Sequence, residues 1–99
     1  MYAVREAHID VETGERTEIE QFVAWFFGFN SEELYSSYEA ARERVETFLV
    51  PHAEDLSRGC GPDYYAGTVV TTDDNGRPVR WCVKRTMFFH TEYRIEERP

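Results

Sequence analysis

No stretch of this 99-residue sequence is apolar over the roughly 20 residues that a membrane-spanning helix requires. Met1 is followed at once by charged, strand-like sequence and not by the apolar core of a secretory signal. We therefore expect a cytoplasmic protein that is not bound to a membrane. With 41% hydrophobic and 15% aromatic residues, the chain is too apolar to be a disordered segment. Its length predicts a single compact domain over residues 1–99.

Positive charge is scarce, and lysine is almost missing. Lys84 is the only lysine among 11 basic residues, which face 19 acidic ones. The net charge of −8 disfavours direct binding to nucleic acid, because nucleic-acid-binding proteins normally carry a basic face. Arginines do lie beside aromatic residues near the end of the chain, where RNA could stack, but they can equally pair with the glutamates. The composition permits a basic partner protein, or an acidic surface that only confers solubility.

Recognisable catalytic motifs are missing as well. The sequence has no glycine-rich phosphate loop, no nucleophile elbow and no paired-histidine zinc motif. Its two cysteines, Cys60 and Cys82, are too far apart for a CxxC pair and are interpreted as free thiols. Cys60 stands between two glycines, and His52 or His90 could activate its thiol. A small hydrolase or transferase that uses Cys60 is therefore an alternative function.

The first predicted hairpin contains a possible metal site. His8, Asp10 and Glu18 could converge there on one face and hold a hard cation through oxygen ligands. The spacing of a calcium-binding EF-hand loop is absent, however, and acidic residues on a solvated strand explain the pattern without an ion. We predict no catalytic residue, no bound metal and no cofactor.

The clearest helical period covers residues 31–50. Apolar side chains recur there every three or four positions, and glutamates occupy the opposite side. Ser31 is a suitable N-cap, and Pro51 is expected to end the helix, because a residue before proline is disfavoured in the helical conformation. The apolar side comprises Leu34, Tyr38, Ala41, Val45, Phe48 and Leu49. We expect this side to be buried against a sheet.

The segments before the helix are predicted to form a hairpin. In residues 2–12, apolar and polar side chains alternate. The apolar face holds Ala3, Ala7, Ile9 and Val11, and the polar face holds Glu6, His8, Asp10 and Glu12. A three-residue loop ending at Gly14 would place Ile9 opposite Thr17 and keep the apolar side chains together. A second strand over residues 15–25 is favoured by its β-branched and aromatic content, although residues 17–27 also fit a helix.

Two further strands are predicted after the helix. Residues 63–72 form the first, Asn75-Gly76 is a strong hairpin signal, and alternating apolar residues from Val79 onward form the second. Residues 91–96 extend that strand or form a short fifth one. The sequence therefore predicts an α+β fold of β-β-α-β-β order. Its antiparallel sheet has four or five strands, with one long amphipathic helix packed on one face.

The arrangement of the acidic residues is more informative than their number. Those of the helix form one file about 21 Å long at 1.5 Å per residue, and those of the first hairpin form a second solvent-facing group. Rows of carboxylates on rigid elements could present a phosphate-like pattern to a basic protein, although any solvated helix face is charged. The predicted partner-binding residues are Glu32, Glu39, Glu43, Glu46, Glu6, Asp10, Glu18 and Glu20.

These features predict a non-enzymatic inhibitor that binds a basic partner, a nucleic-acid-binding complex, and competes for its nucleic-acid site. Small acidic phage proteins of the anti-CRISPR and anti-restriction type combine similar size and charge. An immunity protein that neutralises a toxin nuclease is a related alternative. Charge reversal on the helix should impair only the binding functions, whereas Cys60→Ala should impair only the enzyme.

Overall fold

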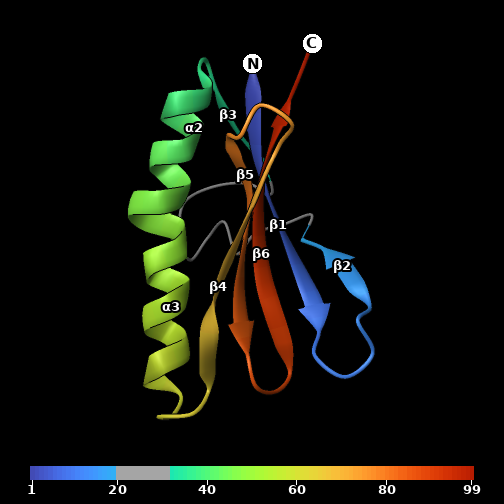
Figure 1. Ribbon diagram of the computed structural model, residues 1–99, viewed down its shortest axis with the longest axis vertical. Helices are drawn as coiled ribbons and strands as arrows, with labels where there is room; N and C mark the ends of the chain where they lie inside the picture. Colours follow the sequence, from blue (N-terminus) through green and yellow to red (C-terminus); the bar gives the residue numbers. More distant parts are fainter. Residues whose placement is uncertain (20–31) are drawn as a thin grey trace.

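The structure, a computed structural model, describes residues 1–19 and 32–99. In these residues the chain forms one antiparallel sheet of six strands and one long helix that lies along one face of the sheet (Figure 1). The strands are β1 (Tyr2–Asp10), β2 (Arg16–Glu18), β3 (Glu32–Tyr35), β4 (Tyr65–Thr72), β5 (Pro78–Arg85) and β6 (Phe89–Glu97). The helical segments α2 (Tyr38–Arg44), η1 (Val45–Leu49) and α3 (Val50–Gly59) follow one another without a break. The predicted α+β class is confirmed.

The sheet has the order β2-β1-β6-β5-β4, with β3 also paired to β1. β6 lies in its centre and pairs with all of β1, so that the two chain ends lie side by side (Figure 1). In residues 1–19 and 32–99 the order is β-β-β-α-β-β-β, which differs from the predicted β-β-α-β-β. Two strands are additional: β3, whose residues were expected to start the helix, and β6, which is a full strand of nine residues and not an extension of β5 or a short fifth strand. Pairing of Leu34 and Tyr35 with β1 overrides the local helical period.

The helix begins at Tyr38, later than predicted. Ser37 is its N-cap, because the Ser37 side chain accepts a hydrogen bond of 3.1 Å from the backbone N–H of Ala40. The predicted N-cap, Ser31, lies outside the described residues. No helix in the described part of the chain is long and apolar enough to cross a membrane.

Pro51 does not end the helix, which continues to Gly59. In an α-helix, a proline ring would clash with the carbonyl four residues earlier, here that of Thr47, and would leave it without a donor. The chain avoids this clash with a five-residue π turn directly before the proline, in which the Val50 N–H donates to the Val45 carbonyl. The prediction failed because it treated the proline as a stop signal and ignored a local change of helix type.

The π turn also changes which side chains reach the core. Tyr38, Ala41, Val45 and Leu49 are buried as predicted, and the buried side continues through Val50, Ala53 and Ser57. Phe48 is 42% exposed and contacts the Arg44 guanidinium and the His52 ring instead. Leu34, on β3, is 52% exposed. The expected burial of Phe48 and Leu34 is therefore wrong.

The sheet packs on the helix with the opposite face of β1 from the one expected. Val4 lies opposite Ile95 and Glu6 opposite Tyr93, and these positions face the helix together with Trp81. Ala3 and Ala7 are also buried, but they lie on the other face of the sheet. The larger apolar side chains of β5 and β6 decide which face meets the helix, and β1 follows their register.

The first hairpin closes one residue away from the predicted register. Ile9 lies opposite Arg16 and His8 opposite Thr17. The reason is Asp10, whose carboxylate accepts hydrogen bonds from the backbone N–H groups of Glu12 and Thr13 and shapes a longer loop. The hairpin predicted at Asn75-Gly76 is confirmed. Residues 20–27, where strand and helix were weighed, lie outside the described residues.

Candidate functional site

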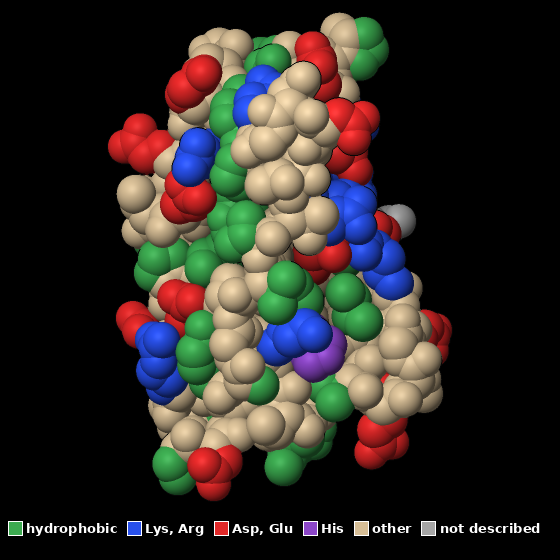
Figure 2. Space-filling view, viewed as in Figure 1, with side chains coloured by type: hydrophobic (Ala, Val, Ile, Leu, Met, Phe, Trp, Pro, Cys, Tyr) green, Lys and Arg blue, Asp and Glu red, His purple; other side chains and the backbone are tan. Residues whose placement is uncertain are grey.

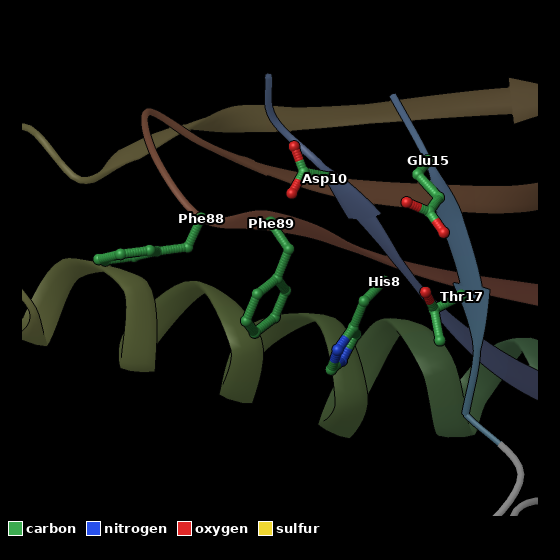
Figure 3. A pocket seen from close by; sticks show the side chains of 6 residues that line it. All are labelled: His8, Asp10, Glu15, Thr17, Phe88 and Phe89. Atoms are coloured by element: carbon green, nitrogen blue, oxygen red, sulfur yellow. The ribbon is translucent and has the colours of Figure 1, made fainter. Parts of the chain in front are cut away.

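Two hairpin ends meet at one end of the sheet and enclose a groove. The loop after β1 and the tip between β5 and β6 are joined by a hydrogen bond of 3.0 Å from the Val11 N–H to the Phe88 carbonyl. The groove has a volume of about 440 Å³ and is lined by His8, Asp10, Glu15, Thr17, Phe88 and Phe89 (Figure 3). A ligand group could enter it from solvent.

One wall of the groove is aromatic. Phe88 is 68% exposed, and its φ of 71° is the only positive value of a described residue other than glycine. Such a backbone costs a bulky residue about 1–3 kcal/mol and is found mainly at functional sites. Phe89 stacks on the ring of His8, and the neighbouring Met87 is also exposed. A strained tip with large exposed apolar side chains is typical of a protein-binding surface.

The other wall carries negative charge. Hydrogen bonds from the backbone N–H groups of Thr13 and Glu12 lower the pKa of Asp10, so its carboxylate stays ionised. Glu15 is exposed and makes no ion pair within the described residues. A groove lined by both carboxylates and aromatic rings suits a cationic head on an apolar stem, such as the side chain of arginine or lysine.

His8 connects this groove to a buried polar group. Its Nε2 lies 3.1 Å from the Glu6 carboxylate, which is only 7% exposed. Tyr93 also contacts Glu6, and burial, followed by the charge of Glu6 and a hydrogen bond to it, raises the pKa of the Tyr93 hydroxyl. The imidazole is therefore held between a fixed carboxylate and the ring of Phe89. This arrangement orients His8 as part of the groove wall.

The acidic residues predicted to bind a partner fall into separate places. Glu39 and Glu43 are exposed on the helix and form no ion pair within the described residues. Glu46 lies on the same helix, but it pairs with Arg42 and accepts a hydrogen bond of 3.3 Å from the indole of Trp81. Figure 2 shows basic side chains among the acidic ones over the helix, so the expected file is interrupted.

Of the hairpin acids that were predicted to bind a partner and that the structure describes, Asp10 reaches the groove, whereas Glu6 and Glu18 do not. Glu6 is buried on the helix side, against the expectation that this face is solvated. Glu18 lies on the opposite face of the sheet, where Arg16 and Arg94 pair with it. Glu32 belongs to β3, and Glu20 lies outside the described residues. The role of the eight glutamates and aspartates in binding a partner stays a prediction.

Arginines on the sheet face opposite the helix are paired with acidic residues. On the sheet face opposite the helix, Arg16 forms two hydrogen bonds to Glu92, and Arg94 pairs with Glu18 and Glu96. Burial alone would raise the pKa of Glu18, but hydrogen bonds from Arg94 and Arg16 outweigh it, and the net shift is downward. These arginines therefore form ion pairs on this face of the sheet.

The metal site considered in the first hairpin does not form. His8 faces the helix side of the sheet and Glu18 the other side, because the register places Ala7 opposite Glu18. Within residues 1–19 and 32–99, no three histidine, cysteine or acidic side chains come together as metal ligands.

Cys60 lies in a second, smaller hollow of about 320 Å³, on another side of Phe88. It is the C-cap of α3. Reactive thiols are found at helix N-termini or beside cations, so the position of Cys60 gives the alternative enzyme little support.

The aromatic wall and the carboxylate of Glu15 were not among the binding residues predicted from the sequence. One feature of the sequence indicates the aromatic wall. The apolar run Met87-Phe88-Phe89 stands between two strand patterns, at a turn that normally carries glycine, asparagine or proline. An apolar run at a turn is exposed by its position, and that combination indicates a binding surface. No family model, no curated protein and no solved structure matches this chain.

Proposed function

We propose that this chain is a non-enzymatic protein-binding domain that inhibits a basic, nucleic-acid-handling partner, in the manner of an anti-CRISPR or anti-restriction protein. The observation that carries the proposal is the exposed, strained Phe88, which lines the same groove as the carboxylates of Asp10 and Glu15. The groove would receive an arginine or lysine side chain of the partner. The Phe88 and Phe89 rings would cover its stem, and the carboxylates would pair with its charge.

The two parts of this site would contribute differently. A large aromatic side chain at the centre of an interface is the kind of residue that dominates affinity, often by about 2 kcal/mol or more. Phe88 fits this description, because it projects from a tip fixed by hydrogen bonds on both sides. Glu39 and Glu43 lie on the helix and would act at longer range by speeding the approach of a basic partner.

The test of the proposal is competition with nucleic acid. The partner is captured with the chain from a lysate of the host that encodes it, and then loaded with fluorescent duplex DNA. The chain should displace the DNA, and Phe88→Ala and Glu15→Lys should each require at least about tenfold more protein to do so. Leu56→Ala, which removes an exposed apolar side chain from the helix, is the matched control and should behave like the wild type.

If saturating wild-type chain leaves DNA binding of the captured protein unchanged, inhibition at a nucleic-acid site is excluded. If the captured partner is a toxin nuclease encoded beside the chain, the same groove and glutamates serve an immunity protein. The identity of the partner separates these two inhibitors, and the response to Phe88→Ala tests the groove in both.

A further inference from the structure

β4 forms one edge of the sheet. It pairs with β5 on one side, and no strand in the described part of the chain pairs with its other side. At the opposite edge, β2 and β3 together cover β1. The outer side of β4 therefore presents a row of backbone N–H and C=O groups that a further strand could pair with.

The sequence of β4 lacks the usual protection of an edge strand. Each of the other five described strands contains at least two charged residues, whereas β4 reads YAGTVVTT and contains none. Proteins commonly blunt an exposed edge with charge, proline or a bulge. Irregular pairing near Gly67 and Thr72 leaves a regular stretch between them. Val69 and Val70, in that stretch, are 49% and 48% exposed.

We propose that two copies of this chain associate by antiparallel pairing of their β4 strands, which joins the two sheets into one. The argument for a second copy is the charge. Two copies of a chain with a net charge of −8 repel one another. A two-fold contact places each segment opposite a reversed copy of itself, and an uncharged segment such as β4 can form this contact without like charges meeting.

The charged side chains nearest to this edge do not oppose the contact. Glu54 accepts a hydrogen bond of 2.9 Å from the Tyr65 hydroxyl, and the Arg58 guanidinium lies 4.6 Å from the centre of the Tyr65 ring. Glu54 also accepts a hydrogen bond of 2.5 Å from the Thr68 hydroxyl, so one acid and one base are held against β4 and their charges cancel. Valine and threonine opposite one another across the two-fold axis are favourable cross-strand pairs.

The proposed dimer leaves the groove of each copy accessible. The groove lies between the ends of the β1–β2 and β5–β6 hairpins, whereas the contact uses the outer side of β4. In one continuous antiparallel sheet, the two-fold axis is perpendicular to the sheet, so both helices lie on the same face. The dimer is therefore independent of the proposed inhibitory function, and it would double the number of partner sites in one particle.

The first test is sedimentation of the wild-type chain at increasing concentration. The mass should rise from the 11.7 kDa of one chain to twice that value. Added salt should favour the dimer, because it screens the repulsion between two acidic chains. The double variant Val69→Lys with Val70→Lys should weaken association at least about tenfold, since like charges then meet across the axis. Thr47→Lys adds one positive charge on the exposed side of the helix, away from β4. This control variant should still dimerise.

Amide hydrogen exchange of the wild type gives a second readout that needs no variant. Protection of β4 amides should increase with chain concentration, while protection of β2 should not. A mass of one chain at every concentration would overturn the proposal, and so would a folded lysine variant that dimerises like the wild type. A wild type that stays monomeric but binds an extended peptide at β4 would also overturn it, because the occupant would then be another protein.

Discussion

The imidazole ring of His8 stacks on the ring of Phe89, with 4.1 Å between the ring centres and 16° between the ring planes. His8 belongs to β1 and Phe89 to β6, so this contact fixes the aromatic tip against the first hairpin. The rings lie side by side in Figure 3, next to Phe88. Because the groove is already assembled, little conformational entropy is lost there when a partner binds.

The helix offers a direct comparison of two neighbouring side chains. Leu49 is buried in the core, and Leu49→Ala should lower the free energy of unfolding by about 2–5 kcal/mol. Phe48 is exposed and contacts Arg44 and His52, so Phe48→Ala should cost only about 1 kcal/mol. Urea unfolding of the two variants measures both values. Equal losses would show that Phe48 is packed in the core.

Ser57 joins the helix to the last hairpin. Its hydroxyl accepts a hydrogen bond of 2.7 Å from Nε of Arg85, and both side chains are buried. Ser57→Ala leaves this buried guanidinium N–H without its acceptor and should lower the free energy of unfolding by about 1–3 kcal/mol. Ser36→Ala, at an exposed position, should have no measurable effect. Chemical denaturation of both variants shows whether the loss of stability comes from the Ser57–Arg85 hydrogen bond or from removing any serine hydroxyl.

His90 makes the hairpin sensitive to pH. Its Nδ1 accepts a hydrogen bond of 3.0 Å from the Arg85 N–H, which requires an unprotonated nitrogen. Burial, with the nearby charges of Lys84 and Arg85, lowers the pKa of His90 from 6.5. The unfolded chain therefore binds the proton more readily. The stabilising contribution of His90 is complete above pH 6.5 and is lost as the pH falls through the lower, folded-state pKa.

Urea unfolding between about pH 8 and about pH 5 measures this contribution. The wild type should lose stability over this range, and His90→Gln should lose less, because glutamine does not titrate. Leu56→Gln changes an exposed helix residue that does not titrate and should keep the full pH dependence. The same slope in His90→Gln and in the wild type would refute the assignment. Glu18, whose pKa is lowered from 4.5, acts only in a more acidic range.

Local signals were sufficient where neighbouring residues alone decide the structure. Asn75-Gly76 predicted its hairpin because few residues adopt the required turn, and the buried side from Tyr38 to Leu49 followed from helical spacing. Leu34 could not be placed in this way. Its strand exists only because β1 lies beside it, which is a contact distant in sequence.

The candidate site was harder to predict because it combines small deviations from the usual rules. The carboxylate of Asp10 lengthens a loop by a residue, and this shift decides that Thr17 lies opposite His8. Phe88 adopts a backbone conformation that its residue type disfavours, so no propensity points to it. Alternation in β1 identified two faces correctly, but the packing of β6 determined which of them meets the helix.

The exposed glutamates of the helix should control the rate of association. Replacing Glu39 and Glu43 with lysine should slow binding to the partner by at least about tenfold at low salt, and the difference should shrink as salt is added. Glu46 is left unchanged, because its carboxylate accepts a hydrogen bond from Trp81 and its loss would disturb the core. Stopped-flow kinetics at two ionic strengths provide the rates. If the folded double variant associates as fast as the wild type, these glutamates contribute to solubility and not to the association rate.

The central claim is that Phe88 is kept in a strained conformation because it binds the partner. Glycine adopts the same backbone without strain, so Phe88→Gly should unfold at the same temperature as the wild type or a higher one. The measurement that tests the claim most directly is the dissociation rate of the captured partner from this variant. The rate should rise by at least about tenfold, since an aromatic anchor is lost while the fold is kept. An unchanged dissociation rate from the folded variant would contradict the account.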